Sequence, residues 1–378
     1  MKILMIPSWY PTPEMPMLGT FYQEQARAMV AAGAEVAVIY ADVNGRLRGN
    51  GVRVFEEAGV YTILTQKLNI TPRCERGRVW QRTAMIRRAY ARLVKEWGRP
   101  DVVNLRSSLQ GYEALALCRR EGLPLFFMEH SSFVLDGLAD AAASRRLKAV
   151  MEQAAVNACV SSALRDVMQP IAETRVIPDL VDDTRFSPQT VEKDDVFRFR
   201  AMGQLRAIKG YDVLIEAFAK LRTRTDRAVC LEIAGKGVLR EELAAQIERL
   251  GVADACRLVG IVPREETPRF MNGADCFICS SRHETLSCVL NEAAACGKPV
   301  ISTHCGGPAD IVTDEIGLLV PTEDSDALCA AMEQMLATAS QYDSARIRTL
   351  TVERFGKAAV SRRLLAACED AVKGGAVT

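Results

Sequence analysis

The stretch Asp275-Cys-Phe-Ile-Cys279-Ser-Ser-Arg-His-Glu284-Thr-Leu-Ser-Cys-Val-Leu-Asn-Glu292-Ala-Ala-Ala-Cys-Gly297-Lys-Pro299 decides the fold class. It begins with an apolar run of strand length, and the polar residues 280–284 follow as a loop. Residues 285–296 then have the length and composition of a helix that ends at a glycine, with a proline just beyond. A strand, a loop and a helix in this order are typical of an α/β domain with a parallel sheet.

The same alternation extends along the whole chain. Short apolar runs, as expected for parallel strands buried on both faces, predict strands at residues 2–7, 35–40, 60–64, 101–105, 124–128, 155–160, 174–177, 197–202, 229–234, 255–259, 275–279, 299–302 and 317–320. Amphipathic stretches between them predict helices that include residues 20–32, 79–97, 211–221, 239–250, 285–296, 327–336 and 357–372.

One break interrupts this alternation. Turn-forming and charged residues gather between Pro178 and Pro188, and more charge follows in Glu192-Lys-Asp-Asp195. We therefore predict two Rossmann-like domains, over residues 1–180 and 181–354. Open α/β sheets bind ligands at the carboxyl ends of their strands, so two such domains facing each other would form a binding cleft.

The composition is that of an ordinary globular protein. The 378 residues include 48 Lys and Arg against 47 Asp and Glu, which gives a formal charge of +1, and 25% are charged. These values exclude a disordered or fibrous protein. Such a balance also provides no global field for binding nucleic acid, and we expect no nucleic-acid partner.

The 12 cysteines are scattered from Cys74 to Cys368, many of them inside apolar runs. In a chain of this length this distribution favours packing as small hydrophobic residues over a disulfide framework. The apolar run at Met1–Pro7 is too short for a signal peptide, and no run of about 18 apolar residues predicts a membrane span. We expect a reduced, cytoplasmic protein.

Two glutamates are candidates for site residues. Glu284 is predicted at the carboxyl end of a strand and at the start of a helix, and Glu292 follows about two helical turns later. Carboxylates that share a face can bind sugar hydroxyls or perform acid–base chemistry. The spacing alone equally allows a helix-capping Glu284 and a solvent-facing Glu292.

Loops at the predicted strand ends supply further candidates. Arg206 and Lys209 follow the strand at 197–202, where cations can hold a diphosphate, although an exposed loop lysine is the simpler alternative. Gly235 and Gly237 form a strand-to-helix turn, either beside a nucleotide base or without any ligand role. The amides of Thr285 and Leu286, predicted to begin a helix, form a candidate anion site.

His130 lies at the carboxyl end of a predicted strand in the first domain, where cleft residues belong, although a lone histidine is commonly structural. Metal binding is not expected. Cys276 and Cys279 have ligand spacing without a second pair, and buried packing explains them. Asp324 and Asp326 precede a predicted helix, where helix capping explains them.

One segment is strongly basic. Residues Arg73 to Arg99 contain nine cations against Glu75 and Glu96. A core-packed helix with a solvated basic face explains this pattern, and the alternative is contact with an anionic membrane or a phosphorylated acceptor.

Taken together, these motifs resemble glycosyltransferase family 4, the retaining GT-B enzymes (glycosyl transferases group 1). Glu284 and Glu292 are similar to the family's E-x7-E motif. The resemblance is carried further by Ser280–Gly307, Ala201–Gly210, Leu214–Phe218, Ile233–Gly237, Pro7–Pro13, Gly19–Phe21, Val176–Asp182 and the helix at Phe355–Glu369. The chain departs from the family pattern at Gln204, where relatives have arginine, and at Thr285 and Ser287, where they often have glycine.

This resemblance implies a GT-B fold and transfer of a sugar, with retention of configuration, from a UDP- or GDP-sugar to a glycan or lipid-linked acceptor. No obligatory metal is implied. Bacterial glycan, lipopolysaccharide or other glycoconjugate synthesis is the expected context, with the protein peripheral on the inner face of the membrane where it meets a lipid-linked acceptor. The second domain would bind the donor, and the first would be the acceptor-side domain, with the helix at about 355–378 packed back on it.

The resemblance also implies roles for single residues. Lys209, with Arg206 in place of the arginine missing at Gln204, would stabilise the departing diphosphate. Glu284 would hold the transferred sugar, and Glu292 the ribose. His130 would position the reacting end of the donor. The other matches at the donor are Gly235, Gly237, Thr285 and Leu286, and those on the acceptor side are Gly19 and Thr20.

Two other functions fit the same architecture. A sugar-nucleotide epimerase would act on the donor without an acceptor. A non-catalytic protein would bind the nucleotide sugar without turnover.

Overall fold

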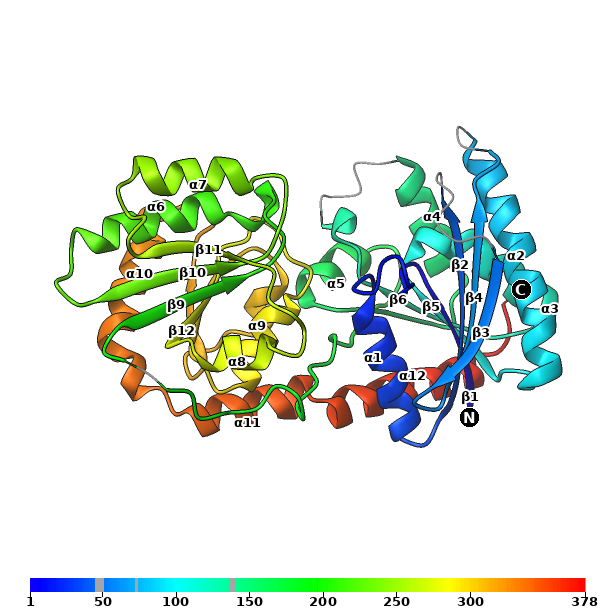
Figure 1. Ribbon diagram of the computed structural model, residues 1–378. Coiled ribbons are helices and arrows are strands. Elements are labelled where there is room, and N and C mark those ends of the chain that lie inside the picture. The colour runs from blue at the N-terminus through cyan, green and yellow to red at the C-terminus, as the bar shows by residue number, and fades with distance from the viewer. Residues whose placement is uncertain (45–50, 72–73, 136–140, 193, 378) are drawn as a thin grey trace. The chain divides into compact units, whose positions relative to one another are not determined.

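The computed structural model describes residues 1–44, 51–71, 74–135, 141–192 and 194–377. The chain divides into two compact units: one comprises Met1–Leu180 with Lys357–Thr378, and the other comprises Val181–Gly356. Each unit is an α/β domain built on its own sheet (Figure 1).

The sheet of the first unit has the strand order β3-β4-β2-β1-β5-β6-β7-β8. Its strands are β1 (Lys2–Pro7), β2 (Glu35–Asn44), β3 (Gly51–Glu57), β4 (Val60–Leu68), β5 (Val102–Arg106), β6 (Leu125–Glu129), β7 (Val156–Cys159) and β8 (Arg175–Val176). All neighbours pair in parallel except β3 with β4. The parallel strands β1, β5 and β6 are almost fully buried, as their continuous apolar runs predict.

Helices cover both faces of this sheet (Figure 1). They are α1 (Thr20–Ala31), α2 (Glu75–Glu96), α3 (Gly111–Glu121), α4 (Ala141–Met151), α5 (Ser162–Met168) and α12 (Lys357–Gly374). The terminal helix α12 packs on α1 and on β5, β6 and β7, while α2 packs on β2 and α3. The last residues of the chain therefore complete the core of the first unit.

The second unit has an all-parallel sheet with the order β11-β10-β9-β12-β13-β14. Its strands are β9 (Phe197–Met202), β10 (Val229–Ala234), β11 (Cys256–Gly260), β12 (Cys276–Cys279), β13 (Val300–Thr303) and β14 (Gly317–Val320). Its helices are α6 (Tyr211–Arg222), α7 (Arg240–Arg249), α8 (Thr267–Asn272), α9 (Cys288–Ala295), α10 (Ser325–Thr338) and α11 (Ser344–Phe355). The strand order reverses between β9 and β12, which makes the carboxyl ends of these two strands the topological switch point.

One predicted helix begins later than expected. The sequence predicts helix from residue 285, but α9 begins at Cys288. Glu284 forms a β-bridge with Gly306, and Ser287 has a positive φ of 81°, so residues 284–287 cannot continue a helix. The prediction that the Thr285 and Leu286 amides open this helix is wrong.

The strand β3 was not predicted. Its residues are nearly all exposed, because it pairs antiparallel at the edge of the sheet and buries neither face. Its sequence, Gly-Val-Arg-Val-Phe-Glu-Glu, lacks the continuous apolar run that predicts a strand buried on both faces.

The state of the cysteines and the helix cap at Asp324 agree with the predictions made from the sequence. All 12 cysteines are free, and most, including Cys276 and Cys279, are buried. Asp324 caps α10 by accepting a hydrogen bond from the Ala327 amide at 2.8 Å. Within the described residues no cluster of His, Cys, Asp and Glu is suited to a metal ion, and no helix there is both long and apolar enough to cross a bilayer.

Candidate functional site

The switch point of the second unit brings together two of the predicted site residues. Lys209 ends a 3₁₀ turn (Ala207–Lys209) that follows β9, and Glu284 lies in the loop after β12. The Lys209 ammonium and the Glu284 carboxylate form an ion pair. The two groups come from adjacent strands, 75 residues apart in the sequence, and meet where open α/β sheets bind ligands.

Neighbouring serines fix this ion pair. The Ser281 hydroxyl donates to Glu284 Oε1 at 2.9 Å, and the Ser280 hydroxyl donates to the Lys209 carbonyl oxygen at 2.9 Å. The Lys209 and Glu284 side chains are 24% and 13% exposed. Burial alone would lower the pKa of Lys209, but the Glu284 carboxylate outweighs it and leaves the pKa raised. Lys209 is therefore a cation at neutral pH that a ligand can still reach.

Glycines allow the surrounding loops to pack closely. A Cβ at Gly235, whose φ is +144°, would lie 1.8 Å from the Gly203 carbonyl oxygen, and one at Gly237 would lie 2.2 Å from the Leu205 carbonyl oxygen. The loops after β9 and β10 are joined here by a hydrogen bond from the Leu205 amide to the Lys236 carbonyl at 3.0 Å. Loop packing thus accounts for both glycines without a ligand.

The other predicted residues of the second unit lie around this pair. Arg206 is exposed and forms no side-chain hydrogen bond or ion pair with the described residues. Thr285 and Leu286 pack on Gly307, where a Cβ would lie 2.1 Å from the Thr285 carbonyl oxygen. Glu292 is on α9 and pairs with Arg264 (Oε1–Nη1 3.9 Å). Glu284 lies before this helix, so the two glutamates do not share a helical face.

In the first unit, His130 directly follows β6 and is 6% exposed. Its Nδ1 lies 3.1 Å from Asp179 Oδ1, within ion-pair distance but without the alignment of a hydrogen bond. Gln25 Nε2 donates to the same Asp179 oxygen at 2.6 Å. The Tyr22 ring packs edge-on against the imidazole, with 4.9 Å between the ring centroids.

A buried carboxylate holds the backbone at His130. Glu129 is fully buried, and its Oε1 accepts hydrogen bonds from the His130 and Ser131 amides at 2.9 and 3.0 Å. Its Oε2 accepts from the Ser108 amide at 3.0 Å and from the Ser108 hydroxyl at 2.6 Å. Glu129 therefore ties the loop after β6 to the loop after β5.

Arg106, at the end of β5, is also fully buried. Burial lowers the pKa of its guanidinium to about 10, so it remains charged at neutral pH. On the same side of the sheet, Gly19 precedes α1 with a φ of +68°, where a Cβ would lie 2.5 Å from the Trp9 carbonyl oxygen. This left-handed glycine lets the loop before Thr20 pack on the start of the helix.

Sequence reasoning missed the contact residues Arg264, Ser281, Asp179 and Gln25. Ser281 lies within the quoted motif, and its place before Glu284 was the one available signal. The fold alone brings three of them to their partners, which lie far away in the sequence: Arg264, Asp179 and Gln25.

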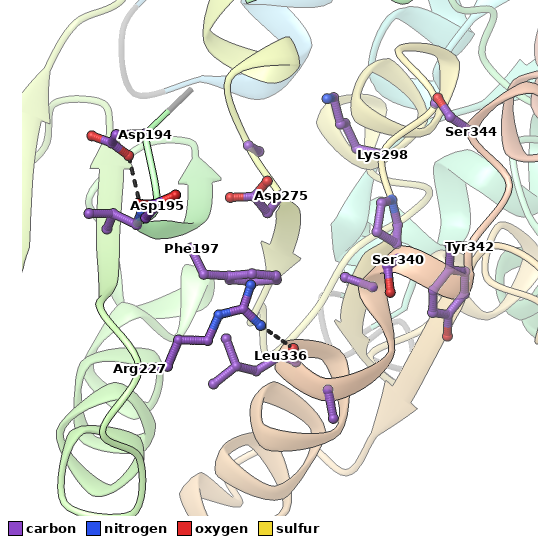
Figure 2. A pocket seen from close by; sticks show the side chains of 16 residues that line it. Asp194, Asp195, Phe197, Arg227, Asp275, Lys298, Leu336, Ser340, Tyr342 and Ser344 are labelled. Atoms are coloured by element: carbon purple, nitrogen blue, oxygen red, sulfur yellow. Dashed lines mark hydrogen bonds between the residues drawn. The ribbon is translucent and has the colours of Figure 1, made fainter. Parts of the chain in front are cut away.

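A pocket of about 500 Å³ lies elsewhere on the second unit (Figure 2). Phe197, Asp275 and Pro299 line it, which places it at the amino ends of β9, β12 and β13. Arg227 stacks over Phe197 and donates to the Leu336 carbonyl oxygen at 2.7 Å (Figure 2). Open α/β sheets bind ligands at the opposite, carboxyl ends, so this pocket is not the candidate site.

Comparisons with known proteins show the family of the chain. The family model "Glycosyl transferases group 1" matches residues 182–349, and "Glycosyltransferase Family 4" matches residues 18–185. The chain is 27% identical to a glycogen synthase of Mycobacterium tuberculosis, over 89% of this chain and 86% of that protein. It is 36% identical to the lipopolysaccharide core biosynthesis glycosyltransferase LpsE of Rhizobium meliloti, over 41% of this chain and 42% of that protein.

The fold has solved counterparts. Anabaena Alr3699/HepE in complex with UDP is similar with a TM-score of 0.74 at 16% identity, over 98% of this chain and all of that one. The two parallel-sheet α/β units and this similarity identify the fold as GT-B. The two family models together extend from residue 18 to residue 349, and the chain belongs to glycosyltransferase family 4.

Proposed function

We propose that the protein transfers a sugar from a UDP- or GDP-sugar to a glycan or lipid-linked acceptor with retention of anomeric configuration. The observation that carries this proposal is the Lys209–Glu284 ion pair at the switch point of the second unit. In the family the second unit binds the donor. HepE, a structural relative, is described in complex with UDP.

The ion pair suits a donor site because each partner can bind one end of a nucleotide sugar in place of the other partner. Lys209 would bind the diphosphate, and Glu284 would bind the sugar. A diphosphate competes with Glu284 for the Lys209 ammonium and gains charge-assisted hydrogen bonds as negative charge develops on it. The Glu284 carboxylate, still held by Ser281, then becomes an acceptor for sugar hydroxyls. Arg206, exposed on the same loop, adds a second cation for the diphosphate.

The remaining donor contacts follow from position. Glu292 binds the ribose, and its pairing with Arg264 keeps the carboxylate ionised and oriented. The backbones of Gly235, Gly237, Thr285 and Leu286 border the donor. No obligatory metal takes part, because the cationic side chains take over the charge of the leaving diphosphate.

In the first unit, His130 positions the reacting end of the donor, and Gly19 and Thr20 lie on the acceptor side. Asp179, fixed by Gln25, lies 3.1 Å from His130 Nδ1 and orients the imidazole ring electrostatically. Asp179→Asn keeps the shape and removes the charge. This variant should lower kcat more than it raises KM. Values of kcat and KM equal to those of the parent protein would contradict this role.

We also propose peripheral contact of the basic segment Arg73–Arg99 with an anionic membrane, from its cytoplasmic side. Arg73 lies outside the described residues, and α2 contains the rest of the segment up to Glu96.

Acceptor-dependent release of nucleotide from a panel of labelled UDP- and GDP-sugars tests the proposed function, with the anomeric configuration of the product read by proton NMR. Glu284→Ala should remove turnover and retain the fold. Inverted product refutes retention. Donor isomerisation without an acceptor indicates an epimerase, and binding without turnover indicates a non-catalytic protein.

A further inference from the structure

The exposed face of α2 carries cations that have no ion-pair partner among the residues that the structure describes. Arg82 pairs with Glu113 at 3.0 Å and Arg92 pairs with Glu96 at 2.8 Å. By contrast, Arg76, Arg87 and Arg88 are exposed and form no ion pair or side-chain hydrogen bond with the described residues. These three charges are available to an anion outside the molecule.

A large aromatic side chain lies in the middle of this cationic face. Trp80 is 66% exposed, and it follows Arg76 by one turn of the helix and precedes Arg87 by two. A tryptophan buried against the core needs no further explanation, but one exposed among arginines does. The opposite face of α2, with Ile86, packs into the core.

Two more exposed apolar residues are held to α2 near its N-terminal end. Leu68, 40% exposed, is the last residue of β4, and Ile70, 66% exposed, follows it before α2. Gln81 holds this segment to the helix: its Oε1 accepts from the Ile70 amide at 3.4 Å, and its Nε2 donates to the Leu68 carbonyl oxygen at 2.7 Å. Because Gln81 follows Trp80 directly, the three apolar side chains lie at the same end of α2. We call Leu68, Ile70, Trp80, Arg76, Arg87 and Arg88 the Trp80 patch. In Figure 1 this helix lies beside β2 and β4.

Apolar side chains among unpaired arginines match the boundary layer of a bilayer. Tryptophan favours the headgroup level of a membrane, and arginines are attracted to anionic lipids while their stems cover apolar surface. A soluble anion would neutralise the arginines but leave Trp80 and Ile70 in water, so it accounts for only half of the patch.

We propose that the Trp80 patch docks on an anionic lipid surface, with Trp80 and Ile70 entering the headgroup layer and Arg76, Arg87 and Arg88 binding lipid phosphates. This inference rests on the membrane contact proposed above for the segment Arg73–Arg99, and it names the side chains and the lipid groups that make the contact. Lipid binding itself requires neither a donor nor turnover.

The natural fluorescence of the chain provides the test, since it has three tryptophans, Trp9, Trp80 and Trp97. Vesicles containing phosphatidylglycerol should shift the emission of the full chain to the blue, and phosphatidylcholine vesicles should not. Trp80→Phe should lose the shift, and Trp97→Phe, at the other end of α2, should keep it. No shift and no co-sedimentation of the parent protein with phosphatidylglycerol vesicles overturns the proposal.

Charge and apolar terms are then separated. The triple variant R76Q/R87Q/R88Q should bind anionic vesicles about a hundredfold more weakly, at about fivefold per cation. The matched control R249Q/R257Q/R269Q, three exposed arginines of the second unit, should bind as the parent does. Equal losses in both triple variants overturn the proposal, because net charge alone then explains binding. Ile70→Ser should weaken binding at high salt, where the electrostatic term is screened.

Three further outcomes would overturn this proposal or the proposed sugar transfer separately. Self-association without vesicles that Trp80→Phe abolishes assigns the patch to a second copy of the chain. If Trp80→Phe keeps transfer to a soluble acceptor while vesicle binding is absent in the parent, docking is refuted and the proposed sugar transfer stands. If vesicle binding follows the pattern above but no acceptor accepts sugar, docking stands and the proposed function is refuted.

Discussion

Replacing Lys209 by methionine should separate the structural from the functional contribution of the ion pair with Glu284. Methionine retains the apolar stem and removes the charge. Ion pairs on the surface contribute about 0–1 kcal/mol, and removing one partner of a fully buried pair costs about 3–5 kcal/mol. With side chains 24% and 13% exposed, and Ser281 still hydrogen-bonded to Glu284, we expect K209M to lower the free energy of unfolding by about 1–2 kcal/mol.

The effect on turnover should be much larger. If Lys209 stabilises the charge on the leaving diphosphate, its loss should lower kcat by about 10²–10³-fold. Lys220 is the matched control, because it also forms ion pairs, with Glu216 and Asp326, on the surface of the same unit. K220M should change kcat little. The assay is steady-state nucleotide release at saturating acceptor, together with urea unfolding of both variants without ligand.

The pH dependence gives a separate test of the ion pair. The pKa of Lys209 in the folded protein is raised above the ordinary 10.5, so protonated Lys209 stabilises the fold fully below about pH 10.5. This contribution is lost as the pH rises through the higher folded-state pKa. The difference in unfolding free energy between the parent and K209M should therefore be constant near neutral pH and shrink above pH 10.5. Parent-like kcat in K209M refutes the reasoning about function, and a stability difference that grows above pH 10.5 refutes the reasoning about the pair.

Three further predictions concern the fold. Gly235→Ala should lower the free energy of unfolding by about 2–4 kcal/mol, because its Cβ would meet a carbonyl oxygen at 1.8 Å. Gly251→Ala, with open space around its Cβ, should lower it by about 1 kcal/mol. Urea unfolding of both variants checks this prediction, and equal losses would contradict it. Asp324→Ala should cost about 1 kcal/mol through the lost cap of α10, and Asp324→Asn should restore most of it in the same assay. Cys74, the exposed cysteine, should react with a thiol reagent far faster than the buried cysteines, and fast labelling of several thiols in the folded protein would contradict the described burial.

Most strands of both sheets were predictable from their apolar runs, whereas the exposed edge strand β3 was not. β1, β9, β10 and β14 agree with the predicted bounds residue for residue. Strand ends then located Lys209, Glu284 and His130, since residues after parallel strands lie at one edge of a sheet. Their assigned roles remain predictions.

Long-range contacts were not predictable in the same way. The start of α9 depends on the bridge between Glu284 and Gly306, which no local preference encodes. The pairing of His130 with Asp179 joins residues from different parts of the first unit. The exposure of Trp80 follows from which face of α2 meets the sheet, and helical periodicity alone gave no role to that side chain.

Nucleotide binding by calorimetry tests the donor site most directly. UDP, GDP and the corresponding nucleosides are titrated into the parent, K209M and Glu284→Gln. Because a charge-assisted hydrogen bond contributes about 1.5–3 kcal/mol, K209M should bind the preferred diphosphate about tenfold more weakly or worse, with nucleoside binding unchanged. E284Q should retain diphosphate affinity and lose affinity for the sugar nucleotide. Parent-like diphosphate affinity in K209M would contradict the assignment of the Lys209–Glu284 pair as the donor site.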